Sequence, residues 1–302
     1  MHKGWTDSPR NILVTGIGGP AGKCASSYLA NCGYTVIGTD MRSLDSDVAH
    51  CVKVPAAEDA AFVPALLKVI EDFHISMLIP TVSEELPIIA GMKDSFSSLG
   101  CHVMIAPHQA IDIANDKLKT ALFLDRHGVE VPLTVPGDIA HAHVIQSIGL
   151  PVIAKPRISR GGRGVVLYNI PEALVLEHRG NIVYQKFMSG EEYDVNLYVN
   201  HKGKIQSCVV LHKTSLREGI VGNAISVKRV QREDIVELCT RAVKVLGITG
   251  PADIDIRDDA SGKPHLLEIN ARLGANALSA SEVLDDLVAD WKSTTHYVEG
   301  IS

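Results

Sequence analysis

Apolar and polar positions in the first third of the chain follow the pattern of buried strands joined by amphipathic helices. Short apolar runs predict strands at 11–16, 34–40, 75–81 and 101–106. The segments between them have helical periodicity, as in AFVPALLKVIEDFH. Strands that are apolar throughout and connected by helices predict a parallel sheet covered on both faces.

After about residue 110 the pattern changes to hairpins and longer strands. One helix is expected through HQAIDIANDKLKTALFLDRH to about His127, where Gly128 breaks it. Strands are expected at 151–155 and 165–168, followed by alternating strand segments to about 214 and a long helix over 232–246. PADIDIRDD and KPHLLEIN then predict a hairpin with ASG at its turn, and a closing helix follows.

Composition narrows the class of protein. The 302 residues are 46% hydrophobic and 21% charged, as in an ordinary globular protein. The net charge is −6, so nothing suggests a surface for nucleic acid. No apolar run reaches the length of a membrane span, and residues 1–10 are interpreted as a leader before the first strand. The six cysteines lack zinc-ligand spacing, and we expect free thiols in a reducing cytoplasm.

The loop GIGGPAG follows the first predicted strand, in the position of a dinucleotide-binding turn. Gly16 and Gly18 fit G-x-G-x-x-G, but Ala21 takes the third glycine position and Pro20 lacks an N–H for a phosphate. Asp40 ends the second strand at about the place of a ribose-binding acid. A nicotinamide cofactor therefore stays open, as do a structural turn and a substrate contact.

The predicted hairpin near the end of the chain carries the strongest chemical signal. Glu268, Asn270 and Arg272 share one face of an extended segment, with Leu267 and Ile269 expected in the core behind them. Asp253 and Asp255 share a face of the preceding strand. Carboxylates gathered at one place repel unless a cation lies among them, and ligands with oxygen atoms alone suit Mg²⁺. A solvated hairpin face is the alternative.

Two further segments fit a phosphate site. Lys155 ends an apolar strand, and SRGGRG after it is rich in backbone amides that suit phosphate oxygens, although it is not a Walker P-loop. The segment YQKFMSGEEYDV ends a strand where backbone groups can meet a base edge, with Glu192 placed for ribose hydroxyls. Taken singly, each segment also fits an ordinary turn.

Together these segments resemble the ATP-grasp superfamily, in its carbamoyl-phosphate-synthase-like and biotin-carboxylase-like branch. The resemblance runs from Asn11 to about Ala280 and is most specific in DID…LLEINAR. It implies an α/β and α+β fold: a Rossmann-like pre-ATP-grasp domain at 11–110 and an ATP-grasp domain at 111–302. The latter would have a nucleotide-lid lobe at about 120–187 and a metal-binding lobe at about 188–302.

The resemblance also assigns roles. It implies ATP with Mg²⁺, two ions by the family pattern and Mn²⁺ as an alternative, held by Asp255, Glu268 and Asn270. Arg272, Lys155 and Asn270 would act in catalysis. The nucleotide would be bound by Lys117, Lys155, Ser159, Arg160, Gly161, Gly162, Gly164, Gln185, Lys186, Phe187, Met188 and Glu192. Gln185 departs from a frequent Glu, and Asp255 from a Gln or Glu. The chain also ends soon after EINAR, which favours a small ligase over a full carbamoyl-phosphate synthase or biotin carboxylase.

The reaction implied by the resemblance is ATP-dependent ligation of a carboxylate to an amine through an acyl phosphate. Glu84, Arg217 and Arg272 are the candidates for substrate binding, and an amino acid or derivative is the expected substrate. We also expect no nucleic-acid or membrane partner, a cytoplasmic protein, and a homodimer. The alternatives are a nicotinamide-dependent oxidoreductase and a non-catalytic ATP-binding regulatory protein.

Overall fold

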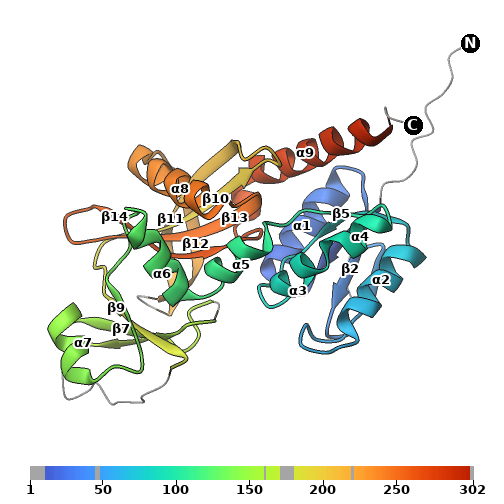
Figure 1. Cartoon of the computed structure of the whole chain (residues 1–302). Helices are drawn as coiled ribbons and strands as arrows, with labels where there is room; N and C mark the ends of the chain where they lie inside the picture. The colour runs from blue at the N-terminus through green and yellow to red at the C-terminus, as the bar shows by residue number, and fades with distance from the viewer. Residues whose placement is uncertain (1–10, 45–47, 160, 171–179, 219–220, 300–302) are drawn as a thin grey trace, which may run out of the picture.

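The computed structural model describes residues 11–44, 48–159, 161–170, 180–218 and 221–299. Their secondary structure forms three sheets with helices packed around them (Figure 1). The expected leader at 1–10 lies outside the described residues. The domain limits given above stay a prediction, although each sheet is drawn from one stretch of the chain.

The first sheet is parallel and has the strand order β3-β2-β1-β4-β5. Its apolar strands are covered by helices, as the pattern predicts. The strands are β1 (Asn11–Thr15), β2 (Thr35–Asp40), β3 (His50–Lys53), β4 (Ile75–Ile79) and β5 (His102–Val103), and the helices are α1 (Pro20–Asn31), α2 (Phe62–Asp72), α3 (Leu86–Gly91) and α4 (Lys93–Ser98). The edge strand β3 was not predicted, since its HCVK sequence has no long apolar run.

Two short helices lead into the second sheet. α5 (His108–Ala114) and α6 (Lys117–Arg126) replace the single helix expected there, because Asp116 caps α6 and starts it anew. The second sheet is antiparallel with the order β6-β9-β7-β8, and α7 (His141–Ile148) packs on it. Its strands are β6 (Thr134–Pro136), β7 (Val152–Pro156), β8 (Val166–Tyr168) and β9 (Ile182–Lys186).

The third sheet is also antiparallel, with the order β12-β11-β10-β13-β14. Its elements are β10 (Glu192–Val199), β11 (Ile205–Glu218), β12 (Val221–Val230), α8 (Glu233–Leu246), β13 (Gly250–Asp258), β14 (Pro264–Asn270), the 3-10 helix η2 (Ala277–Ala280) and α9 (Glu282–Glu299). The predicted long helix, hairpin and closing helix are confirmed. None of the described helices is long and apolar enough to cross a membrane.

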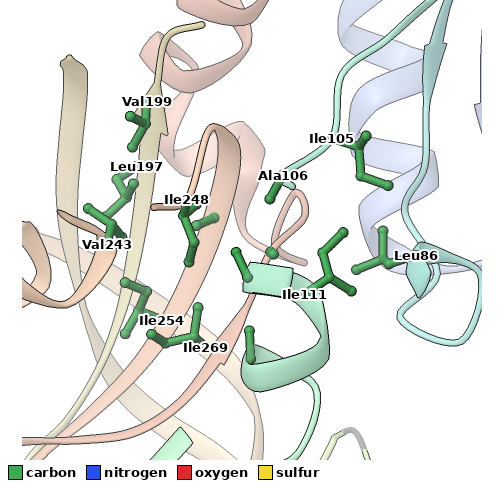
Figure 2. Packing of buried hydrophobic residues seen from close by; sticks show 14 of the residues in the cluster. Leu86, Ile105, Ala106, Ile111, Leu197, Val199, Val243, Ile248, Ile254 and Ile269 are labelled. Atoms are coloured by element: carbon green, nitrogen blue, oxygen red, sulfur yellow. The ribbon is translucent and has the colours of Figure 1, made fainter. Parts of the chain in front are cut away.

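One apolar core runs from the first sheet to the third. Ile111 on α5 lies between Leu86 of the N-terminal part and Ile269 of β14 (Figure 2). The same cluster continues through Ile254 to Val243 on α8. One face of the third sheet is therefore buried under α5 and α8. The other face is partly covered by α9 (Glu282–Glu299), which packs on Tyr198, and elsewhere carries polar side chains.

Candidate active site

A cleft lies between the second and third sheets. Most of the residues predicted for the nucleotide and the metal line it, and they come from both sheets and from α6. The predicted residues in its lining are Lys117, Lys155, Ser159, Gly161, Gly162, Gln185, Lys186, Phe187, Met188, Glu192, Asp255, Glu268, Asn270 and Arg272. The fold thus gathers side chains that are up to 155 positions apart in the sequence.

The floor of the cleft is the polar face of the third sheet. Strand register sets Asp255 of β13 beside Asp194 of β10 on one side and Glu268 of β14 on the other. Two residues earlier on β13, Asp253 pairs with Asn196 of β10 on one side and with Asn270 of β14 on the other. Side chains of neighbouring strands on one face lie about 5 Å apart, so the floor carries two polar rows that the sequence shows only as separate alternations.

A β-bulge in β14 changes one prediction. The pairing shifts between Asp255–Glu268 and Ile256–Leu266, which leaves Leu267 without a partner of its own. Leu266 therefore takes the buried place, and Leu267 lines the cleft beside Glu268. The expectation that Leu267 packs in the core was wrong, whereas Ile269 is buried as expected.

Lys117 opens α6 and reaches into the cleft. Asp116 caps this helix by accepting hydrogen bonds from the amides of Leu118 and Lys119. The Nζ atom of Lys117 donates to the carbonyl oxygen of Ser159 at 2.8 Å and lies 3.0 Å from Oε2 of Glu268. The cap of α6 thus fixes a cation between the glycine loop and the predicted metal ligand.

Lys155 lies at the end of β7 with 7% of its surface exposed. Burial lowers the pKa of its ammonium to about 8, since the favourable field of Glu268 only partly offsets desolvation and the nearby charge of Lys117. Burial alone would raise the pKa of Glu268, but Lys117 and Lys155 lower it to about 2. The two lysines and Glu268 form one coupled group of charges.

Lys213 on β11 was missed by the sequence interpretation. Its Nζ atom donates to Oε1 of Glu192 at 2.8 Å and also to Oδ1 of Asp255. Burial raises the pKa of Asp255 to about 7, although Lys213 draws it down. The alternation of polar and apolar residues along β11 is a sequence signal that could have pointed to Lys213. Only the register of β11 with β10 shows that Lys213 lies between these two acids.

The glycine loop closes one side of the cleft. Gly161, Gly162 and Gly164 have φ of 63°, 74° and 73°, a backbone region that glycine adopts without strain. Gly161 and Gly162 line the cleft, and Gly164 packs toward Pro156. Arg160 lies outside the described residues.

The end of β9 and the residues just after it form the far end of the cleft. Gln185 donates from Nε2 to Oγ1 of Thr134 at 2.9 Å, so its amide is engaged within the second sheet. Met188 is buried, and the guanidinium of Arg257 lies over the ring of Phe187 at 5.1 Å. Arg257 also donates to Glu192 at 3.3 Å, so this acid is held by two cations.

Arg272 follows β14 and turns back toward the floor. Its Nη1 atom donates to Oδ2 of Asp253 at 3.2 Å and to the carbonyl of Leu273 at 2.7 Å. Its Nε atom donates to Oγ of Ser83 at 3.2 Å, which ties the site to the N-terminal part of the chain.

A second cavity opens beside Lys117, Ser159, Glu268 and Asn270, on the side of the first sheet. Glu84 lines this cavity and not the main cleft. The backbone of Arg217 lies in β11, but its side chain is outside the described part of the chain. The adjoining cavity is therefore the space in which a predicted substrate residue meets the predicted metal ligands.

The N-terminal glycine loop is filled by its own neighbours. Asp40 accepts hydrogen bonds from the amide of Gly18 at 3.0 Å and from the amide and Nε of Arg42. A side chain at Gly18 would meet Arg42 and Asp40 within 3 Å. The acid expected to bind ribose is thus used to hold the turn, which disfavours a nicotinamide cofactor here.

The donor set on β13 and β14 fits a hard divalent ion. Asp255 and Glu268 are paired residues on neighbouring strands, and burial penalises their charge in the absence of cations. Three or more His, Cys, Asp or Glu side chains arranged around one point are not found among the described residues. The predicted set has two carboxylates and an amide oxygen, and its role stays a prediction.

Comparison with known families adds the decisive observation, since the model of the ATP-grasp domain matches residues 114–276. This chain belongs to the ATP-grasp family. The match covers more than half of the chain and includes α6, the glycine loop and the E-x-N-x-R segment of this ATP-grasp protein. The predicted superfamily and fold class are confirmed.

Relatives of this ATP-grasp protein are ligases. It is 26% identical to a D-alanine–D-alanine ligase of Chromohalobacter salexigens over 51% of the chain and 54% of the relative. It is 24% identical to a phosphoribosylamine–glycine ligase of Ralstonia nicotianae over 87% of the chain and 68% of the relative. The chain thus spans only about half the length of the first of these enzymes. A carbamoyl phosphate synthase large chain and a biotin carboxylase, the two enzymes of the predicted branch, also match.

Among solved structures, an L-amino acid ligase from Bacillus licheniformis superimposes with a TM-score of 0.67 at 19% identity. The superposition covers 91% of this ATP-grasp chain and 70% of that enzyme. At this identity the likeness shows a shared fold.

Proposed function

We propose that the protein is an ATP-dependent ligase that joins a carboxylate to an amine through an acyl phosphate. The observation that carries the proposal is the convergence of Lys117, Lys155 and Arg272 on the cleft floor that holds Asp255 and Glu268. Phosphoryl transfer needs positioning and neutralised charge rather than a protein nucleophile, and this arrangement offers both.

In the first step an oxygen of the substrate carboxylate attacks the γ-phosphorus of ATP. The bond to the β,γ-bridging oxygen breaks, and ADP leaves. Lys117 and Lys155 neutralise the phosphates from the side of α6 and β7, and Arg272 holds the transferred group by its guanidinium fork. The amine then forms the C–N bond, inorganic phosphate leaves from the acyl carbon, and the amine proton passes to solvent.

Asp255, Glu268 and Asn270 would hold Mg²⁺, which supplies charge neutralisation of the phosphates when bound. ATP-grasp ligases use ATP with Mg²⁺; we further propose two ions, with Mn²⁺ able to substitute. Lys213 contacts Asp255 and Lys117 contacts Glu268, and each ammonium favours the charged form of its carboxylate.

The remaining residues bind and shield the nucleotide. Lys186 to Met188 and Glu192 line the end of the cleft that suits adenine and ribose, and Gly161 and Gly162 face the phosphate end. Exclusion of water protects an acyl phosphate from hydrolysis. Glu84 in the adjoining cavity and Arg217 are proposed to contact substrate. We also propose a cytoplasmic protein that forms a homodimer, with the domain limits given above.

Amino-acid-like substrates are part of the proposal. The named relatives include a D-alanine–D-alanine ligase and a phosphoribosylamine–glycine ligase, and both names specify an amino acid. Which acid and which amine are joined is the question that the following experiment addresses.

The test is ADP release from Mg·ATP in the presence of pairs of amino acids and small carboxylic acids. Glu268→Gln should lower the stimulated rate at least a hundredfold, because it removes a charged metal ligand but preserves shape. A matched control is Glu71→Gln, at an exposed position on α2. Stimulation that survives Glu268→Gln would refute the site. ATP binding without ADP release under every pair would favour a regulatory protein.

A further inference from the structure

Gln185 brings an amide to the face of the second sheet that borders the cleft. Strand register sets it between Thr134 of β6 and Ile153 of β7. Ile153 also lines the cleft, whereas Tyr184, the neighbour of Gln185 in β9, packs on the opposite face under α7. Gln185 is only 3% exposed. Its side chain is therefore a fixed part of the cleft wall, within reach of a ligand in the cleft.

Two linked hydrogen bonds fix which end of this amide faces the cleft. The hydroxyl of Thr134 donates to the carbonyl oxygen of Pro132 at 2.8 Å. Because a carbonyl oxygen can only accept, the hydroxyl proton is committed, and Oγ1 of Thr134 remains as an acceptor. Gln185 must then present Nε2 to Thr134, as it does at 2.9 Å. The Oε1 atom of Gln185 is thereby turned away from β6.

This Oε1 atom is the polar group that the arrangement leaves for a ligand. No residue in the described part of the chain donates a hydrogen bond to it. Polar atoms of buried side chains are nearly always paired, so an unpaired acceptor at a cleft indicates a donor on the ligand. Ile153, Phe187 and Met188 line the same end of the cleft, and such an apolar surface suits a purine base.

The two purine bases differ in the group that such an acceptor would meet. Adenine carries an exocyclic amine, N6, which donates, whereas guanine carries the oxygen O6 in the same place, which only accepts. Oε1 of Gln185 can pair with the amine, but beside O6 it would form a contact of two acceptors without a proton. A turned amide would reverse this preference, since Nε2 would then face the base.

The hydroxyl of Thr134 opposes that turn. If the amide turned, Oε1 would need the proton of Thr134, and the buried carbonyl of Pro132 would lose the hydroxyl that now donates to it. An unmade hydrogen bond at a buried group is costly, so the turned amide is disfavoured. The glutamate that the family pattern frequently has at position 185 carries two acceptor oxygens and needs no such constraint.

We propose that Thr134 sets the base selectivity of the site by holding the amide of Gln185 with its oxygen toward the amine of adenine. Thr134 acts through Gln185 and is therefore a positioning residue. The inference rests on the proposed function, because it requires that a nucleotide binds in the cleft.

Isothermal titration calorimetry with Mg·ATP and Mg·GTP measures this selectivity without any turnover. The wild-type protein should bind ATP roughly tenfold to a hundredfold more tightly than GTP, the usual effect of one buried polar group left unpaired. Thr134→Val keeps the shape of the side chain but removes the hydroxyl, and it should lower the ratio of the two Kd values about tenfold. Thr134→Ser keeps the hydroxyl and should keep the ratio.

Two further variants separate the orientation of the amide from packing. Gln185→Glu presents an acceptor in either orientation, so the double variant Thr134→Val/Gln185→Glu should recover the preference for ATP. Thr120→Val is the matched control, because Thr120 is also buried and donates from Oγ1 to a backbone carbonyl, that of Ile113, at 2.7 Å. It should leave the ratio of the two Kd values unchanged.

Each outcome has its own meaning. A ratio that Thr134→Val leaves unchanged, that Thr120→Val lowers equally, or that the double variant does not recover overturns the inference and leaves ATP binding standing. Equal binding of ATP and GTP by the wild-type protein likewise overturns the inference alone. Binding of neither nucleotide overturns the proposed function and the inference with it. If Thr134→Val does not fold, Thr134→Ala is compared with Thr134→Ser in its place.

Discussion

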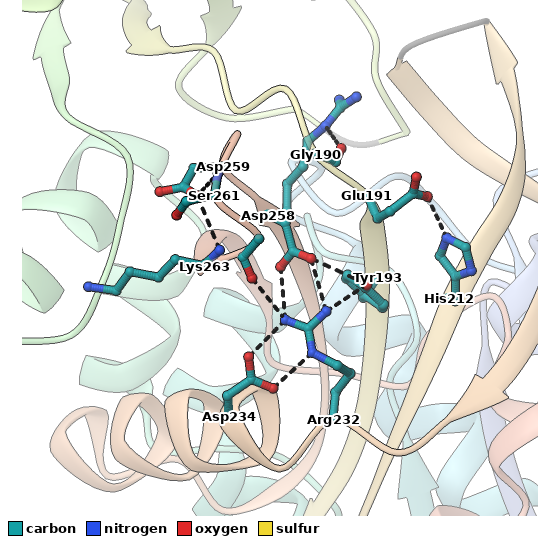
Figure 3. A network of polar contacts seen from close by, with 12 residues as sticks. Gly190, Glu191, Tyr193, His212, Arg232, Asp234, Asp258, Asp259, Ser261 and Lys263 are labelled. Carbon is teal, nitrogen blue, oxygen red and sulfur yellow. Dashed lines mark hydrogen bonds and ion pairs between the residues drawn. The ribbon is translucent and has the colours of Figure 1, made fainter.

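Replacing Arg232 with alanine should destabilise the protein more than removing any exposed ion pair. Arg232 precedes α8 and donates to both oxygens of Asp258, at 2.9 and 3.1 Å, and to the hydroxyl of Tyr193 at 2.7 Å (Figure 3). It also pairs with Asp234 at 2.8 Å. Asp258 is 6% exposed and ends β13, where its backbone bonds hold Gly190 and Glu191 at the start of β10.

The expected loss in the free energy of unfolding follows from the hydrogen bonds that Asp258 loses in Arg232→Ala. Among the described residues, the side chain of Asp258 would keep the hydroxyl of Tyr193 at 3.3 Å as its donor. A buried charge that loses its partner costs about 3–5 kcal/mol. Arg232 itself is 24% exposed, so water can replace part of the loss, and we expect about 3 kcal/mol. For a chain of 302 residues, that corresponds to a fall in Tm of roughly 5 °C.

The control is Arg229→Ala. Arg229 makes an equally bidentate pair with Glu282, but the two side chains are 50% and 45% exposed. Exposed pairs contribute about 1 kcal/mol or less. Differential scanning calorimetry of both variants measures the difference, and the double variant with Asp258→Asn should recover part of the loss. Equal Tm values for the two single variants would refute the argument from burial.

Two more predictions concern the cleft. ATP affinity should fall as the pH rises above about 8, because Lys155 loses its proton there and the phosphates of ATP favour its ammonium form. Calorimetry in buffers of different ionisation enthalpy should show that the protein takes up protons when it binds ATP near pH 8. Absence of proton uptake would contradict the lowered pKa of Lys155. Leu266→Ala should cost about 2–4 kcal/mol of stability, whereas Leu267→Ala should weaken ATP binding with little change in Tm; the reverse pattern would argue against the bulge.

The order of strands and helices could be read from the sequence wherever a local pattern sets it. The apolar strands β1, β2 and β4 and the hairpin of β13 and β14 were predicted because their periodicity is contained within a few residues. The short edge strand β3 was missed because its sequence has no strong pattern. The break between α5 and α6 was missed because the cap at Asp116 lies inside a helical run.

The sequence by itself predicted which residues would line the cleft, because the E-x-N-x-R segment, the glycine loop and the lysine at a strand end are local signals. Only the tertiary structure decided how they meet. Strand register sets Lys213 between Glu192 and Asp255, a bulge turns Leu267 into the cleft, and the loop after β14 brings Gly274 onto Asn196. These contacts join segments that are far apart in the chain. The periodicity of one strand shows which of its residues share a face, but it does not show how that strand aligns with its neighbour.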